Sequence, residues 1–217
     1  MGDLLVSAAV LGAVVLLSEA TRRAAARLLP AGLRLSALEA ASTFQLCSCT
    51  HELKLLADSS RLDAPLGLSL CFLMTVVHIL SFREATCNPC AALERLVRGR
   101  SSLLAALVLV GLQFGAAVAA QSFASCVWSL GLSAVHAQHR RFGFRCFDPL
   151  GGSLLEAAAA ELGCAFCVHA AAMHAHKLDE KLRVPFMAAV ITALVYTGVF
   201  LSCSLTFLRS SPVVSDH

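Results

Sequence analysis

The chain has 217 residues, of which 58% are hydrophobic and 14% charged, and its mean hydropathy is +0.75. This composition lies outside the range of ordinary soluble domains and is typical of membrane proteins. The formal net charge is only +3, and the basic residues are dispersed among apolar stretches instead of being gathered with aromatic residues. A nucleic-acid-binding protein is therefore excluded.

The chain contains ten cysteines, a number that would indicate a disulfide scaffold in a short secreted protein. Most of them lie in apolar segments, where cysteine behaves as a small hydrophobic residue. These are Cys47, Cys49, Cys71, Cys126, Cys164, Cys167 and Cys203. Cys146 lies in a polar loop and is the candidate for a disulfide or a modification outside the bilayer. The cysteine count therefore does not identify the compartment.

The first apolar run covers residues 4–17 and is short for a membrane span. Asp3 precedes this run and the basic residues follow it, which reverses the charge order of a cleavable signal peptide. We therefore expect an uncleaved signal-anchor or a partly embedded N-terminal helix, with its basic flank in the cytosol.

Further apolar runs predict helical spans, and a polar connection separates the third from the fourth. The runs cover residues 38–56, 66–82, 103–132, 154–173 and 184–207, and the connection covers residues 136–152. The first of these runs contains Glu39, and a carboxylate in a membrane helix is costly unless it faces the interior of the bundle. Placing residues 22–34, 83–100 and 177–183 in the cytosol satisfies the positive-inside rule, although the loop with Arg140 and Arg141 is an exception.

A short polar break, Cys87-Asn88-Pro89-Cys90, separates the second and third of these runs. Asn88 suits a helix N-cap, and Pro89 suits the first helical position, where its missing N–H costs nothing. The following residues 91–97 form about two turns of helix, too short to cross a hydrocarbon core of about 30 Å. This pattern predicts a re-entrant hemi-helix, and the alternative is an extramembrane turn.

Two of the runs share a pattern in which a glutamate is followed five residues later by phenylalanine: Glu39 with Phe44, and Glu161 with Phe166. In the predicted orientation these runs cross the membrane in opposite directions, which indicates an inverted repeat. A second Asn-Pro pair would be expected near residue 210, and the sequence there contains none. We therefore expect the second half-repeat to be incomplete.

Several motifs together resemble the unorthodox, or super-aquaporin, subfamily of the aquaporin (major intrinsic protein) family. They are Leu38-Glu39, Thr43-Phe44-Gln45-Leu46-Cys47, Cys49-Thr50-His51-Glu52-Leu53, Asn88-Pro89-Cys90, Trp128-Ser129-Leu130-Gly131-Leu132, Lys181-Leu182-Arg183 and Ala193-Leu194-Val195-Tyr196. The resemblance covers residues 38–198. It implies a membrane channel for water and small neutral solutes, such as glycerol and hydrogen peroxide, in the endoplasmic reticulum membrane. It also implies assembly into tetramers as a homo- or hetero-oligomer with aquaporin subunits.

The same resemblance implies roles for individual residues. Asn88 would donate its amide to permeating water, and Pro89 and Cys90 would begin a hemi-helix whose positive dipole end repels cations and protons. Glu39 and Glu161 would match the carboxylates that brace the re-entrant loops. The family continues after residue 198 into a second re-entrant loop and a last span, which residues 199–217 do not resemble. The chain is therefore expected to be a C-terminally truncated form.

The expected fold is an all-α membrane protein: an aquaporin-like helical bundle with one re-entrant hemi-helix and an incomplete second half-repeat. Its predicted parts are an N-terminal apolar helix with basic flank (1–34), a first repeat with the Asn-Pro-Cys hemi-helix (35–132), a polar loop (133–152), an incomplete second repeat (153–207) and a polar tail (208–217). The predicted function is a channel along a path past Asn88. The alternative is a non-conducting form that associates with or regulates full-length subunits.

Two cysteine motifs allow other chemistry. Cys87 and Cys90 form a Cys-x-x-Cys pair at a helix N-terminus, which is either a redox pair or the family's box residue beside a small apolar neighbour. Cys164 and Cys167, with nearby histidines, have spacings that could bind a metal, but a packed helix accounts for them and no metal site is predicted. No catalytic motif stands out, so we predict no enzyme and no cofactor, with the lipid bilayer as partner.

Overall fold

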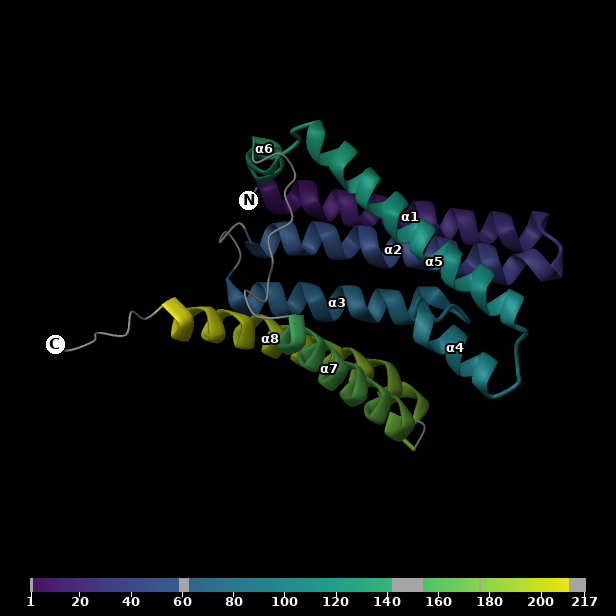
Figure 1. Cartoon of the computed structure of the whole chain (residues 1–217). Helices are drawn as coiled ribbons and strands as arrows, with labels where there is room; N and C mark the ends of the chain where they lie inside the picture. Colours follow the sequence, from purple (N-terminus) through teal and green to yellow (C-terminus); the bar gives the residue numbers. More distant parts are fainter. Residues whose placement is uncertain (1, 59–62, 142–153, 176, 211–217) are drawn as a thin grey trace. The chain divides into compact units, whose positions relative to one another are not determined.

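The computed structural model of the chain describes residues 2–58, 63–141, 154–175 and 177–210, with the backbone alone at 31, 58, 154, 156–157, 160–161 and 198–210. All regular structure in these ranges is α-helical (Figure 1). The helices are α1 (Gly2–Leu28), α2 (Ala31–Asp58), α3 (Ala64–Phe82), α4 (Pro89–Val97), α5 (Leu103–Ser129), α6 (Ala134–Arg141), α7 (Leu154–Ala175) and α8 (Glu180–Ser210). The expected all-α fold is confirmed.

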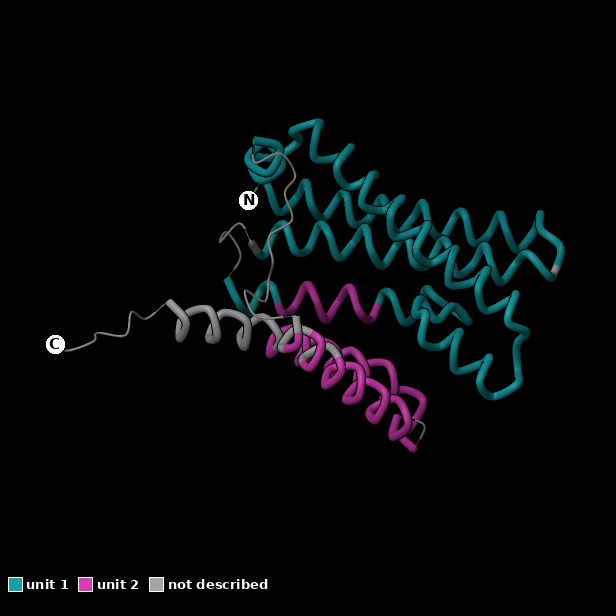
Figure 2. The backbone as a smooth tube through the Cα atoms, viewed as in Figure 1, with its two compact units in different colours: residues 1–67, 77–144 teal, residues 68–76, 145–217 magenta. Residues whose placement is uncertain are grey.

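The chain divides into two compact units (Figure 2). Unit 1 comprises residues 1–67 and 77–144, and unit 2 comprises residues 68–76 and 145–217. Unit 1 contains the Asn-Pro-Cys break and is the part in which the candidate site is built. The domain boundaries predicted from the sequence stay a prediction.

In unit 1, α2 packs against both α1 and α5, while α4 and α6 each pack against α5 (Figure 1). The buried positions of α1 recur every three or four residues, which is the spacing of a helix seam. They are Ser7, Leu11, Val14, Ser18, Arg22 and Ala25. Three of these six residues are polar, and Ser7 and Arg22 donate hydrogen bonds to α2, so the pairing of α1 with α2 depends on hydrogen bonds as well as on packing.

Among the described helices, α1, α3 and α5 are long and apolar enough to cross a membrane, with mean hydropathies of 2.0, 1.9 and 2.3. Large apolar side chains such as Leu16, Leu80 and Phe114 are exposed on them. Many exposed large apolar side chains on long apolar helices are costly in water but suit a lipid environment. The chain is an integral membrane protein, as the composition predicts.

The N-terminal helix is longer than the apolar run of residues 4–17 that predicts it, and α1 as a whole is long enough for a span. The apolar run ends at Leu17, but α1 continues as helix through the basic residues to Leu28, and α2 begins at Ala31 instead of residue 38. The hydropathy of the sequence shows where a helix leaves an apolar environment, but it does not show where the helix ends. The helix ends only near Pro30, because proline has no N–H group to continue the hydrogen bonding of α1. The basic flank therefore belongs to two helices.

The polar connection predicted over residues 136–152 begins as helix α6. The backbone N–H of His136 donates to the Ser133 hydroxyl at 3.1 Å, a side-chain cap that favours a helix start. Gly131 in the preceding turn has φ +64°, a conformation that glycine adopts without strain. Cys146 lies outside the residues that the structure describes.

Unit 2 contains the antiparallel pair α7 and α8, which pack against each other. The guanidinium of Arg183 donates from Nε to the Ala175 carbonyl at 3.3 Å and thus caps the end of α7. The two helices contain the apolar runs at residues 154–173 and 184–207, each with a short polar extension, and their crossing of the membrane stays a prediction.

Candidate functional site

The Asn-Pro-Cys break forms the start of α4. Asn88 is the N-cap, with φ −139° and ψ 118°, and Pro89 is the first helical residue. The Asn88 Oδ1 accepts a hydrogen bond from the Cys90 backbone N–H at 2.9 Å. This bond satisfies one of the N–H groups that a helix start leaves unpaired.

The cap bond also fixes which end of the Asn88 amide is free. Because a backbone N–H can only donate, the atom that faces it must be the amide oxygen. The Nδ2 group then points away from the helix, and no partner for it is found among the described residues. Asn88 is exposed. It therefore presents two N–H donors to whatever fills the space in front of α4.

A buried carboxylate holds the loop that leads into Asn88. Glu39 of α2 is fully buried, and its Oε1 accepts from the Thr86 backbone N–H and the Thr86 hydroxyl, both at 2.9 Å. Its Oε2 accepts from the Cys87 backbone N–H at 2.9 Å. Hydrogen bonds to an ionised group are stronger than neutral ones, so this carboxylate is a firm anchor for the loop.

Two further side chains complete the surroundings of Glu39. Gln113 of α5 donates from Nε2 to Glu39 Oε2 at 3.1 Å, and Arg95 of α4 places Nη2 3.5 Å from Oε1. Arg95 also donates to the Thr86 hydroxyl at 3.4 Å. Neither Gln113 nor Arg95 is among the site residues predicted from the sequence. The signal for Gln113 was present, since a polar side chain inside a long apolar run needs a buried partner.

Cys87 lies in a strained part of this loop. Its φ of +51° is in the left-handed region, which non-glycine residues seldom adopt, at a cost of about 1–3 kcal/mol. The bonds from Thr86 and Cys87 to Glu39 hold the backbone in this conformation. Both Cys87 and Cys90 are free thiols in the structure, and the redox role stays a prediction.

A second buried carboxylate, Glu52, lies near the other end of α2 and joins four elements. Its Oε1 accepts from the Ser7 hydroxyl of α1 and lies 2.9 Å from His136 Nε2 of α6. Its Oε2 accepts from the Trp128 indole of α5 at 2.8 Å. The requirement for buried partners that applies to Glu39 applies to Glu52 as well, but the sequence does not identify those partners.

A third polar cluster centres on Arg22, which is fully buried. Its guanidinium donates to Glu19 at 3.0 Å, to Gln45 at 2.9 Å and to Ser42 at 3.4 Å. A buried arginine is tolerated only when its donors are satisfied in this way. The cluster therefore fixes α1 against α2 at the end opposite to Ser7.

Two other sets of predicted residues lie in α7. Glu161 belongs to the helix, but its side chain is outside the part of the chain that the structure describes. Cys164 and Cys167 are free thiols. Within the described ranges, no three histidine, cysteine or acidic side chains gather as a metal site would require.

The comparison with known proteins identifies the family. The chain is 36% identical to human (Homo sapiens) aquaporin-11 over 161 residues, which are 74% of this chain and 59% of that relative. It is 31% identical to mouse (Mus musculus) aquaporin-12 over 203 residues, 91% of this chain and 70% of the relative. The chain belongs to the aquaporin family. This aquaporin is also 29% identical to human putative aquaporin-12B over 227 residues, which cover 100% of this chain and 74% of the relative.

This membership confirms the resemblance to the unorthodox subfamily. The motifs within residues 38–198 point to the aquaporin-11 type and residues 18–23 to the aquaporin-12 type, and relatives with both names are found. Because these relatives are channels, the prediction that the chain is not an enzyme is confirmed. The chain spans about three-fifths of the aquaporin-11 relatives, 59% in the human protein. No protein-family model and no solved structure matches it.

Proposed function

We propose that this aquaporin forms a channel for water and small neutral solutes, such as glycerol and hydrogen peroxide, along a path past Asn88. The observation that carries the proposal is the geometry of Asn88, whose oxygen is committed to the Cys90 N–H while its amide N–H groups have no partner among the described residues. A donor held in this way orients the oxygen of a passing water or hydroxyl group.

Charge selectivity follows from the same helix. The N-terminus of a helix carries a partial positive charge of about half an elementary charge, which disfavours cations and protons nearby. Pro89 and Cys90 form the first helical positions of α4. We propose that they line the mouth of the path together with Asn88.

Glu39 and Glu161 are proposed as the two bracing carboxylates. Irregular backbone at membrane depth is stable only if its polar groups have partners in the protein. The Thr86 and Cys87 N–H groups have such a partner in Glu39, which supports placing this loop within the membrane. By family resemblance, Glu161 matches the carboxylate that braces the second loop of the family, a loop that residues 199–217 do not resemble. The channel assembles as a tetramer in the endoplasmic reticulum membrane.

The test uses the purified chain in proteoliposomes, with osmotic shrinkage followed by stopped-flow light scattering. Asn88→Asp keeps the cap acceptor but replaces the donating amide by a charged oxygen, and Asn88→Ser keeps a cap without any amide. We expect faster shrinkage than in empty liposomes with the unchanged chain, and loss of most of that increase in both variants.

The liposome experiment also separates the proposal from its alternative. Shrinkage no faster than in empty liposomes would contradict conduction by this chain and favour association with other aquaporin subunits. Shrinkage that is fast but unaffected by either Asn88 substitution would show that the path does not pass this residue.

A further inference from the structure

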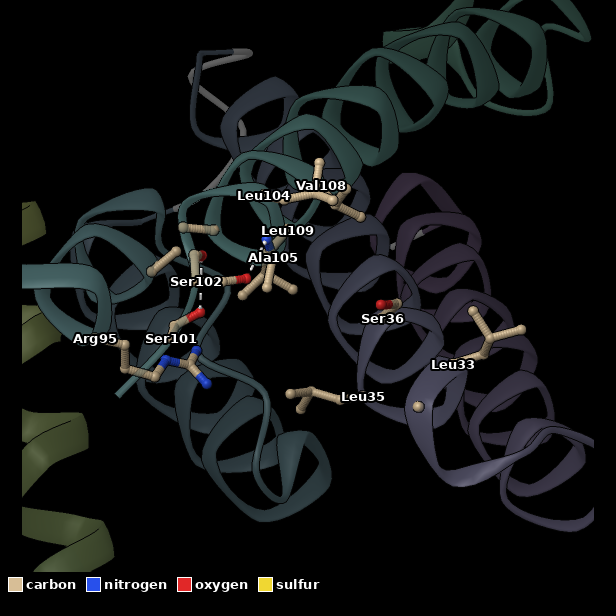
Figure 3. Close-up of a pocket in the computed structure, with 13 residues that line it drawn as sticks. Leu33, Leu35, Ser36, Arg95, Ser101, Ser102, Leu104, Ala105, Val108 and Leu109 are labelled. Carbon is tan, nitrogen blue, oxygen red and sulfur yellow. Dashed lines mark hydrogen bonds between the residues drawn. The ribbon is translucent and has the colours of Figure 1, made fainter. Parts of the chain in front are cut away.

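A cavity of about 400 Å³ in unit 1 lies apart from Asn88, between the first turns of α2, the end of α4 and the first turns of α5 (Figure 3). Its apolar lining comes mostly from alanine, leucine and valine side chains. Its polar lining consists of Ser36, Arg95, Ser101 and Ser102. The cavity therefore has one cationic side chain and no acidic side chain in its wall.

The polar groups gather where α5 begins. Figure 3 shows the Arg95 guanidinium on the same side of the cavity as Ser101 and Ser102. The contacts that Arg95 makes to Glu39, Thr86 and Ala91 are long, 3.4–3.5 Å, and no partner of its Nη1 is found among the described residues. Arg95 thus keeps donors for an anion, and the helix start beside it has a positive field.

The apolar wall opens toward the outside of unit 1. Leu33, Leu104 and Val108 line the cavity, and their exposed fractions are 56%, 72% and 49%. Such side chains beside a cation match a ligand with a charged head and an apolar tail. A small free anion would contact the polar groups of the cavity but not these apolar side chains.

The candidate span of α5 implies that the cavity is near the membrane surface. Leu103–Ser129 is a candidate span, so Ser101 and Ser102 stand where that span leaves the hydrocarbon, and Leu104 and Val108 lie inside it. The predicted orientation places this end of α5 in the cytosol, whose leaflet carries the anionic lipids. Exposed Arg34 on α2 adds a second positive charge near this end of unit 1, whereas Arg98, the C-cap residue of α4, is paired with Glu94.

We infer that this cavity binds an anionic phospholipid of the surrounding bilayer. The lipid phosphate would contact Arg95 and the hydroxyls of Ser101 and Ser102, and its acyl chains would lie along Leu33, Leu104 and Val108. Basic pockets between spanning helices on the cytosolic side are suited to such headgroups. The inference does not depend on conduction past Asn88.

The experiment is a lipid titration of the purified full chain in detergent, followed by native mass spectrometry. Phosphatidylserine is compared with phosphatidylcholine, and inorganic phosphate is added as a competitor. Ser36→Glu places a negative charge inside the cavity, whereas Arg34→Gln changes the net charge of the chain by the same amount at an exposed position outside its lining. Ser36→Gln matches the size of the first variant without its charge.

We expect phosphatidylserine to bind more tightly than phosphatidylcholine, Ser36→Glu to weaken that binding on the order of tenfold, and Arg34→Gln to weaken it less than about twofold. Loss of binding in Ser36→Gln as well would also support occupancy of the cavity, provided that both variants keep the heat stability of the unchanged chain. Equal losses in Ser36→Glu and Arg34→Gln would overturn the inference in favour of diffuse attraction. Equal binding of both lipids, or complete competition by inorganic phosphate, would also overturn it.

Discussion

Replacing Glu39 by glutamine tests whether its carboxylate holds the loop before Asn88. The substitution keeps the shape of the side chain but exchanges one acceptor oxygen for a donor. Glu39 accepts from two groups of Thr86, from Cys87 and from Gln113, at 2.9–3.1 Å. All of these groups are donors, so an amide cannot satisfy them all.

The loss of unfolding free energy in Glu39→Gln can be estimated from the hydrogen bonds that the glutamine can still make. The Oε1 of Gln113 is buried without a partner among the described residues, so Gln113 can turn its amide and accept from the new NH₂ group. The two bonds from Thr86 then persist, and the Cys87 N–H is left facing a donor. One unpaired buried N–H together with the loss of charge assistance costs about 2–4 kcal/mol.

The assay is the free energy of unfolding of the purified chain, measured by denaturant titration in detergent. Trp128 is the single tryptophan, and its fluorescence reports on unit 1. The control is Glu94→Gln on α4, the same chemical change in an exposed pair with Arg98, for which we expect less than about 1 kcal/mol. Similar losses in the two variants would refute the bracing role of Glu39.

Two further substitutions test the contacts between α1 and α2. Arg22→Lys keeps the charge but loses the branched guanidinium, which donates to Glu19 and to side chains of α2, so the free energy of unfolding should fall by about 2–4 kcal/mol. The exposed control Arg23→Lys should change the free energy of unfolding little. Ser7→Ala removes a hydrogen-bond donor to the buried Glu52 and should lower the free energy of unfolding by about 1–2 kcal/mol in the same titration. The control Ser122→Ala, on the exposed side of α5, should lower it by less than about 0.5 kcal/mol. Equal effects within either pair would contradict the buried cluster concerned.

The start of α4 could be predicted from the sequence because the rules that determine it are local. An asparagine that accepts from the N–H two residues later and a proline at the first helical position act within one turn. The length of α5 could be predicted in the same way, since no charged residue interrupts its apolar run from Leu103 to the turn at Gly131. In both places no distant residue alters the outcome.

The partners of the buried charges could not be predicted. A carboxylate in an apolar run must have donors, and this much follows from Glu39 and Glu52 alone. Which donors they are depends on how helices far apart in the sequence pack, as with Gln113 and Trp128 of α5. The length of α1 was missed for a related reason, because Arg22 is stabilised by side chains of a different helix.

The polarity of α2 has a consequence for how the chain is made. Glu39 and Glu52 lie about 20 Å apart along this helix and about 140° apart around it, so the two carboxylates lie on different faces of α2. Its polar groups are satisfied by Arg22 and Ser7, which are synthesised earlier, and by Gln113 and Trp128, which are synthesised later. We therefore expect α2 to enter the bilayer as a hairpin with α1 and to remain beside the insertion machinery until α5 has emerged. Membrane insertion and folding of unit 1 would then be a single event.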